Sequence, residues 1–262
     1  MEKGMKVWVL AAACVAAACA QAADGDRLAE IARRTEARTF TGKDGTVFRY
    51  RWAAKDAADG SKVPVVVFLH GAGERGTNNV AQLVHGVPEL VAWLEAHEKG
   101  YRLFAGQVPE GKLWVDVPWS AKRHTMPERP SETMALALEF LDSLLADPSV
   151  DPARVYVTGI SMGGYGTWDM ICRRPGLFAA ALPICGGGDA AQAAKIAHVP
   201  VWTFHGSADG AVPVCRSRDM VSALWAAGSN AHYREYPDAG HGVWARTYGD
   251  AEVLKWFFAQ HQ

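Results

Sequence analysis

Two patterns of apolar residues alternate along this chain. Short runs that are apolar at every position predict strands covered on both faces, and residues 63–69 (Val-Pro-Val-Val-Val-Phe-Leu) are the clearest of them. Apolar residues that recur every three or four positions predict helices, as between residues 134 and 145, where Asp147-Pro148 ends the pattern. The chain is therefore expected to alternate strands with helices.

The remaining segments fit the same alternation. Residues 46–52 alternate apolar and polar side chains, which predicts a half-buried strand at an edge of the sheet. Residues 24–38 predict a short helix or a loose arm, and residues 251–259 predict the last helix. Strands that alternate with helices favour an α/β fold whose sheet is mostly parallel and covered by helices on both faces. Other strands are expected at five short segments, residues 113–117, 155–158, 180–184, 201–204 and 231–236.

The composition, with 49% apolar and 21% charged residues, is that of an ordinary globular protein. The formal net charge is −1, so the chain lacks the excess of positive charge typical of nucleic-acid-binding proteins, and no nucleic acid partner is expected. No repeat, low-complexity tract or linker divides residues 23–262, and we expect a single domain there.

The N-terminal segment, residues 1–22, has the layout of a cleavable export signal. Two lysines precede an apolar run at residues 7–20, and Ala20-Gln21-Ala22 fits the small-x-small cleavage pattern. The run is too short to cross a bilayer, so we expect no membrane span and a secreted or periplasmic protein. Lipidation at Cys19 is the less favoured alternative, because the residue three positions earlier is alanine rather than a bulky aliphatic.

Three cysteines follow that segment, Cys172, Cys185 and Cys215. An oxidising compartment permits one disulfide among them with one thiol left over, and burial as small apolar residues is equally compatible. Their spacing is not that of a zinc site and the chain has no H-E-x-x-H motif, so we expect no metal site.

The strongest chemical signal is Gly159-Ile160-Ser161-Met162-Gly163, which lies between a predicted strand and a segment typical of a helix start. In that context G-x-S-x-G is a strained turn that holds the serine hydroxyl clear of the sheet as a nucleophile. Its two glycines are needed where the neighbouring backbone leaves no room for a Cβ. An ordinary tight turn is the competing interpretation. We favour the nucleophile and expect Ser161 to be catalytic.

A serine hydroxyl becomes nucleophilic when a histidine accepts its proton and a carboxylate orients that histidine. In α/β-hydrolases the acid and then the histidine follow the serine along the chain. Asp209 and His241 each come just after a predicted strand in that order. A turn-capping role for Asp209 and a surface position for His241 are the alternatives. Asp238, which lies three residues from His241, and Asp189, which follows an earlier strand, are the rival acids.

The loop at residues 71–76 (Gly-Ala-Gly-Glu-Arg-Gly) follows the buried strand at 63–69. We expect its Ala72 N–H and the Met162 N–H to form an oxyanion hole, because glycines let the backbone approach the reacting atoms. The loop also spells the G-x-G-x-x-G dinucleotide fingerprint. The strand is not the first of the domain and Glu74 would repel a pyrophosphate, so we disfavour that reading and expect no cofactor.

Aromatic and histidine side chains near these loops receive weaker assignments. Trp119, Trp168 and Trp244 are close to them in sequence. Trp244, which follows the loop of His241, is the candidate for a substrate contact, and ordinary packing in the core is the alternative for all three. His70 and His205 each stand before a glycine at a strand end and are interpreted as structural.

Three of these segments together resemble one family, the exported esterases related to polyhydroxybutyrate depolymerases and to bacterial feruloyl and acetylxylan esterases. That family belongs to the prolyl-oligopeptidase-like branch of the α/β-hydrolases. The resemblance covers essentially all of residues 23–262 and implies the α/β-hydrolase fold. It is carried by residues 69–76 with Asn78, Asn79 and Gln82, by residues 159–168 and by residues 183–189.

By this resemblance Ser161, Asp209 and His241 take the three catalytic roles. Cys215 stands where the family more usually has a charged or polar residue, which leaves a disulfide with Cys185 open.

The sequence therefore predicts a secreted serine carboxylesterase that forms an acyl-enzyme and needs no metal or organic cofactor. The resemblance implies esters of plant cell-wall polysaccharides, acetyl or feruloyl, as substrates. Two alternatives remain: a secreted serine peptidase of the same branch, and a catalytically silent hydrolase fold that binds carbohydrate.

Overall fold

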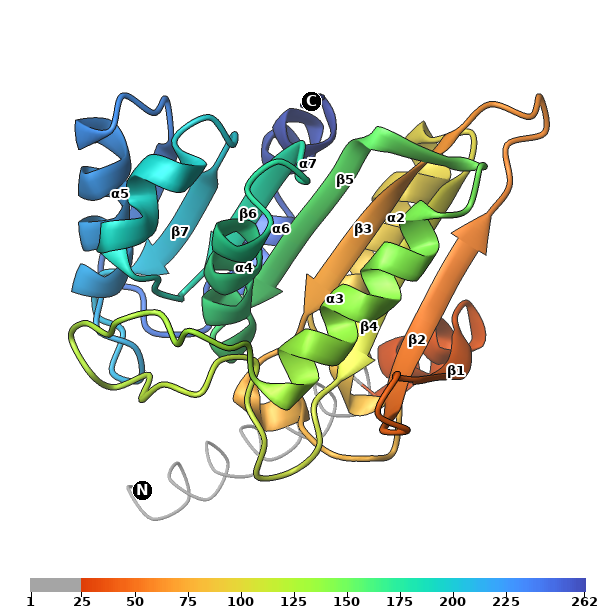
Figure 1. Cartoon of the computed structure of the whole chain (residues 1–262), viewed down its shortest axis with the longest axis horizontal. Helices are drawn as coiled ribbons and strands as arrows, with labels where there is room; N and C mark the ends of the chain where they lie inside the picture. Colours follow the sequence, from red (N-terminus) through yellow and green to blue (C-terminus); the bar gives the residue numbers. More distant parts are fainter. Residues whose placement is uncertain (1–24) are drawn as a thin grey trace, which may run out of the picture.

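The structure, a computed structural model, describes residues 25–262, and the predicted export signal at residues 1–22 lies outside the described residues. One eight-stranded sheet runs through the molecule, with helices on both faces (Figure 1). Its strands are β1 (Glu36–Thr41), β2 (Val47–Lys55), β3 (Val63–Leu69), β4 (Tyr101–Gln107), β5 (Val150–Ile160), β6 (Ala180–Ile184), β7 (Trp202–Gly206) and β8 (His232–Tyr236).

The order across the sheet is β1-β2-β4-β3-β5-β6-β7-β8. β2 pairs antiparallel with both β1 and β4, and every other neighbouring pair is parallel. The predicted mostly parallel α/β sheet is confirmed. β3 lies at its centre and is buried at all its positions, as its unbroken apolar run predicts.

Helices cover the sheet in two layers, each with its own apolar core (Figure 1). One layer holds α3 (Glu132–Leu145), α4 (Met162–Arg173), α5 (Cys215–Ala226) and the 3₁₀ segment η3 (Ala190–Ile196). The other holds a helix at residues 25–33, α2 (Val87–His97), α6 (Trp244–Tyr248) and α7 (Ala251–Phe258). Short 3₁₀ turns, η1 (Ala72–Glu74) and η2 (Ala81–Leu83), follow β3.

The predicted edge position of the strand at 46–52 is wrong. β2 lies between β1 and β4, and β1 is the edge strand. The sequence of β1, Glu-Ala-Arg-Thr-Phe-Thr, is polar because an edge strand with exposed side chains needs few apolar residues. For this reason the sequence pattern does not distinguish residues 36–38 from the arm expected at residues 24–38.

The expected strand at 113–117 is also wrong, and β4 takes its place in the sheet. Residues 113–117 form an irregular loop in which Asp116 is exposed and Trp114 and Val115 are buried. Trp114 fills the core and donates its indole N–H to the His70 carbonyl at 3.0 Å. The sequence pattern does not predict β4, because Arg102 and Gly106 interrupt its apolar residues. Gly106 is needed there, since a Cβ would lie 2.4 Å from the Phe48 ring.

The other expected strands and helices are present, with β5 extending well beyond the predicted 155–158. None of the helices formed by residues 25–262 combines the length and apolar character needed to cross a bilayer. Because β3, β5, β7 and β8 run parallel, the loops that follow their carboxyl ends meet at one edge of the sheet. Those loops carry Ala72, Ser161, Asp209 and His241.

Candidate active site

Ser161 occupies a strained turn between β5 and α4. Its backbone lies at φ 54° and ψ −117°, a region that side-chain-bearing residues rarely adopt. The Ser161 N–H donates to the Ile184 carbonyl at 2.8 Å, which ties the turn to the neighbouring strand β6. The turn holds the serine side chain at the carboxyl edge of the sheet, as the G-x-S-x-G motif predicts.

The two motif glycines are required by close backbone contacts. A Cβ on Gly163 would lie 1.8 Å from the Leu69 carbonyl oxygen, and one on Gly159 would lie 2.4 Å from the Gly163 oxygen. Both contacts are with backbone, which cannot rotate away. The helix start can therefore pack against β3 only with glycine at these positions.

Gly163→Ala is expected to destabilise the fold by about 3 kcal/mol or more, because the added methyl overpacks a contact that no side chain can relieve. The control is Gly176→Ala, since no atom lies within 4 Å of the Cβ position of Gly176. Urea unfolding followed by far-ultraviolet circular dichroism measures both changes. Equal free energies of unfolding for the two variants would contradict the claim that the contact with Leu69 excludes a Cβ at residue 163.

Ser161, His241 and Asp209 form a continuous hydrogen-bonded chain. The His241 Nδ1–H donates to Asp209 Oδ2 at 2.7 Å, and the Ser161 hydroxyl donates to His241 Nε2 at 2.8 Å. An ionised aspartate can accept hydrogen bonds but cannot donate them, so its contact fixes the proton on Nδ1 and leaves Nε2 as the acceptor. The structure thus brings together the three residues that the sequence singled out.

Asp209 is held from several sides. Its Oδ1 accepts the N–H groups of Ala211 at 2.8 Å and Val212 at 2.9 Å, and its side chain is 0% exposed. His205 Nε2 lies 3.1 Å from Oδ2. Burial alone would raise the pKa of Asp209, but hydrogen bonds from His205, His241 and two backbone N–H groups outweigh it and hold the pKa well below its usual range.

His205 therefore supports the site as well as the fold. Its Nε2 faces two acceptors, Asp209 Oδ2 and the Val212 carbonyl, while Nδ1 lies 2.8 Å from the Ser217 hydroxyl. The structural interpretation of His205 missed its contact with the candidate acid. The signal that could have revealed it is the four-residue spacing in His205-Gly-Ser-Ala-Asp209.

The rival acids lie elsewhere. Asp189 caps η3, where its Oδ1 accepts the Ala191 N–H at 3.1 Å and its Oδ2 accepts the Met126 N–H at 3.0 Å. Asp238 is exposed, and its own N–H donates to the Ser207 hydroxyl at 2.8 Å. Neither carboxylate contacts His241.

A cavity of about 330 Å³ opens beside Ser161 and His241. Its walls include Ala72, Val212, Trp119 and Trp244. The Trp244 ring lies edge-on to His241, with centroids 5.3 Å apart at 88°. Trp168, by contrast, is fully buried in the core and lines no cavity wall here. The volume and mostly apolar lining suit a small organic group.

Two backbone N–H groups are free of protein acceptors here: that of Ala72, which lines the cavity, and that of Met162, which follows the lining residue Ser161. Met162 is the first residue of α4, where the first N–H groups of a helix have no partner within the helix. Ala72 begins the 3₁₀ turn after β3, and none of the carbonyls of residues 25–262 accepts a hydrogen bond from the N–H of either residue. The predicted pair of donors is thus unoccupied by protein acceptors.

The model of the dienelactone hydrolase family matches residues 51–253. This chain belongs to the dienelactone hydrolase family. The predicted relationship to α/β-hydrolase esterases is thereby confirmed, and the match covers the sheet from β2 to β8 and every loop described above.

The chain is also similar to three other proteins. The solved structure of a thermostable esterase superposes with a TM-score of 0.79 at 36% identity, covering 88% of this chain and 64% of that one. Poly(3-hydroxyalkanoate) depolymerase C of Paucimonas lemoignei is 47% identical over 49 residues, which are 19% of this chain and 12% of the depolymerase. A probable carboxylesterase of Oryza sativa subsp. japonica is 24% identical over 189 residues, covering 67% and 80% of the two chains. The chain thus spans less than two thirds of the depolymerase and of the esterase structure.

In this dienelactone hydrolase family member, the loop at 71–76 does not enter a long helix as a dinucleotide fingerprint requires. It forms the single 3₁₀ turn η1, and Glu74 lines the cavity beside Ser161. Burial raises the pKa of Glu74, whose Oε2 is buried without a hydrogen-bond partner. The loop geometry favours an oxyanion loop over a pyrophosphate cradle.

The cysteines carry no disulfide in the described part of the chain: Cys172, Cys185 and Cys215 are all free thiols. Cys185 instead donates its Sγ–H to the His241 carbonyl at 3.2 Å. Cys185, His205 and Asp209 offer atoms within 4.8 Å of one another, a spacing that a metal could bridge. Burial raises the pKa of the Cys185 thiol to about 12, and Asp209 already accepts four hydrogen bonds, so the cluster is poorly prepared for a cation.

His70 is interpreted correctly as structural. It is fully buried, donates from Nδ1 to the Gly71 carbonyl at 2.6 Å and accepts the Val108 N–H at Nε2. Burial lowers its pKa from 6.5 to about 4. Neutral His70 thereby fixes the start of the loop at residues 71–76 against Val108.

His70 should make the fold acid-sensitive. Its folded-state pKa lies below the unfolded value, so the unfolded chain binds the extra proton first. The His70 contribution is fully present above pH 6.5 and is lost as pH falls toward 4, by up to about 3 kcal/mol. Urea unfolding across this range measures the slope. His70→Gln should flatten it, and an unchanged slope would contradict the assignment.

Proposed function

We propose that this chain is a carboxylesterase that uses Ser161 as nucleophile, His241 as general base and acid, and Asp209 as the group that orients His241. The observation that carries the proposal is the continuous Asp209–His241–Ser161 hydrogen-bonded chain beside an open cavity. Membership of the dienelactone hydrolase family and the thermostable esterase structure support a hydrolase that acts on ester bonds.

The reaction proceeds in two halves. Ser161 Oγ attacks the ester carbonyl carbon while His241 Nε2 takes its proton, and His241 then protonates the departing alcohol. Water attacks the resulting acyl-enzyme with His241 again as base, which releases the acid and restores Ser161. Ionised Asp209 stabilises the imidazolium formed in each half, and its lowered pKa keeps it ionised in mildly acidic solution.

The Ala72 and Met162 N–H groups stabilise the alkoxide of each tetrahedral intermediate. Loss of one such donor typically costs about 10²–10³ in rate. The positive end of α4 adds to the same effect, because Met162 is its first residue.

We further propose that the enzyme is exported after cleavage at residues 20–22 and acts on acetyl or feruloyl esters of plant cell-wall polysaccharides. The export pattern of residues 1–22 and the resemblance to feruloyl and acetylxylan esterases support this. Trp119 and Trp244, which line the cavity, offer flat faces for a sugar or phenolic ring.

A substrate panel tests the proposal. Wild type is expected to hydrolyse 4-nitrophenyl acetate and at least one of a feruloyl ester and acetylated xylan, and to be labelled by a fluorophosphonate. A prolyl 4-nitroanilide should be cleaved far more slowly. Faster cleavage of the anilide would favour the peptidase alternative, and absence of labelling would favour a silent, carbohydrate-binding fold.

A further inference from the structure

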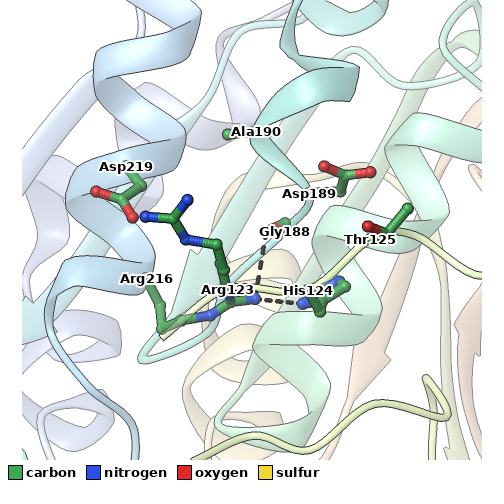
Figure 2. Close-up of a pocket in the computed structure, with 8 residues that line it drawn as sticks. All are labelled: Arg123, His124, Thr125, Gly188, Asp189, Ala190, Arg216 and Asp219. Atoms are coloured by element: carbon green, nitrogen blue, oxygen red, sulfur yellow. Dashed lines mark hydrogen bonds between the residues drawn. The ribbon is translucent and has the colours of Figure 1, made fainter. Parts of the chain in front are cut away.

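A second cavity, of about 430 Å³, opens at the same edge of the sheet as the cavity beside Ser161 and His241, which is called the ester cavity below. Figure 2 shows the residues that line the second cavity. Three segments build it: the loop between β4 and α3, the loop after β6, and the first turns of α5. The ester mechanism uses none of its residues. They are Arg123, His124, Thr125, Gly188, Asp189, Ala190, Arg216 and Asp219.

The cavity contains a buried cation without a counter-ion. Arg216 is 3% exposed, and the ion pairs formed among residues 25–262 do not include it. Its guanidinium carbon lies 5.3 Å from the centroid of the Tyr165 ring. A buried charge normally has an ionised partner, because removal from water is costly. The protein thus buries this cation without an ion-pair partner.

The guanidinium is fixed by contacts with neutral groups. Its Nη2 donates to the Gly188 carbonyl at 3.3 Å and to His124 Nδ1 (Figure 2). The loop after β6 makes room for it, since a Cβ on Gly187 would lie 2.5 Å from Arg216 Nε. This close approach gives a reason for glycine at residue 187, which the ester chemistry does not require. Nη1 takes no part in these contacts and is left for a ligand.

His124 is held as a neutral donor. Because its Nδ1 accepts from Arg216, its proton sits on Nε2. Burial, and then the charge of Arg216, lower the pKa of His124 to about 4. His124 therefore adds an N–H to the cavity at neutral pH rather than an acceptor. Arg123, exposed at the rim, adds a second guanidinium.

The two carboxylates of the cavity, Asp189 and Asp219, form no ion pair with Arg123 or Arg216. Both oxygens of Asp189 already accept N–H groups, from Ala191, Met126 and the side chain of Gln192. Burial opposes ionisation of Asp189, but these hydrogen bonds outweigh it and lower the pKa. Asp219 is exposed, and the ion pairs formed among residues 25–262 do not include it. The free groups of the cavity are thus mainly donors.

We propose that this cavity is a binding site for a carboxylate, which buried Arg216 and exposed Arg123 would bind together. A planar guanidinium matches the planar, two-oxygen geometry of a carboxylate, and the His124 Nε2–H supplies a further donor. The site lies next to the ester cavity: Tyr165, on which Arg216 stacks, donates its hydroxyl to the carbonyl of Trp119, which lines the ester cavity. The carboxylate is carried either by the ester substrate or by a free acid.

Binding of adipate tests the site without any need for hydrolysis. Isothermal titration calorimetry of the full chain, at ionic strength kept constant, should show adipate binding with one site and the uncharged diamide, adipamide, not binding. Arg216→Gln should weaken adipate binding by about tenfold or more. Arg216→Lys keeps the positive charge but loses the bidentate geometry of the guanidinium, so it should weaken binding less. Arg123→Gln, a change at the exposed rim, should weaken it several-fold.

The matched control is Arg218→Gln on the same helix, since Arg218 is exposed, pairs with Glu235 at 2.6 Å and lies outside the cavity. It should bind adipate as wild type does. Equal binding of adipate and adipamide, or equal weakening by Arg218→Gln and Arg123→Gln, would overturn the proposal. If circular dichroism shows that Arg216→Gln does not fold, the adipate affinities of Arg216→Lys and Arg123→Gln test the proposal instead.

A kinetic comparison separates the two sources of the carboxylate. The ratio of kcat/KM for the mono-4-nitrophenyl esters of adipic and suberic acid to that for their methyl esters should fall in Arg123→Gln if substrate carries the carboxylate. An unchanged ratio, with adipate binding still dependent on Arg216 and Arg123, assigns the site to a free acid. Absence of all ester hydrolysis would contradict the proposed function and leave the binding result standing.

Discussion

Ser161→Ala is expected to lower kcat for 4-nitrophenyl acetate by about 10⁴–10⁶-fold, because no other group can form the acyl-enzyme. The Ser161 hydroxyl is the only group within hydrogen-bond distance of His241 Nε2 among residues 25–262. The variant should fold normally, since alanine keeps the Cβ and removes one hydroxyl. Stopped-flow or steady-state absorbance of released nitrophenolate measures the loss, and fluorophosphonate labelling should disappear with it.

Ser161→Gly provides a control that separates chemistry from strain. Ser161 has φ 54° and ψ −117°, which glycine adopts more easily than serine. The glycine variant should be as inactive as Ser161→Ala but more stable by about 1 kcal/mol or more. Retention of more than a few per cent of wild-type turnover by either variant would contradict the mechanism.

Asp209→Asn is expected to lower kcat by about 10⁴-fold. An asparagine amide can donate to His241 Nδ1, which would move the imidazole proton to Nε2 and leave no acceptor for the Ser161 hydroxyl. KM should change little, because Asp209 has a fully buried side chain and does not line the ester cavity. Steady-state kinetics on 4-nitrophenyl acetate separates the two constants.

Asp238→Asn is the matched control for Asp209→Asn. It removes the same charge from the same edge of the sheet, three residues from His241, and asparagine tolerates the φ of 56° found at this position. Activity close to wild type is expected. A loss of activity similar to that of Asp209→Asn would contradict the assignment of Asp209 as the carboxylate that orients His241.

Much of the fold could be predicted from periodicity because the central strands are buried on both faces. β3 and β6 are short apolar runs of the kind that buried parallel strands form. The errors occurred where a strand contains polar residues for tertiary reasons. Arg102 in β4 is 8% exposed because it donates to Ser149 and to the Lys55 carbonyl, partners that sequence alone does not pair with it.

The sequence by itself determined the nucleophile motif, the two glycines that it needs and the order serine, acid, histidine. These follow from local properties: a strained turn, the absence of a Cβ and the position of a residue just after a strand. Only the tertiary structure decided that Asp209 rather than Asp189 or Asp238 faces His241, and that His205 supports Asp209. It also decided that Arg216 is buried without a counter-ion. Each of these depends on contacts between segments far apart in the chain, which exist only once β5, β7 and β8 lie in one sheet.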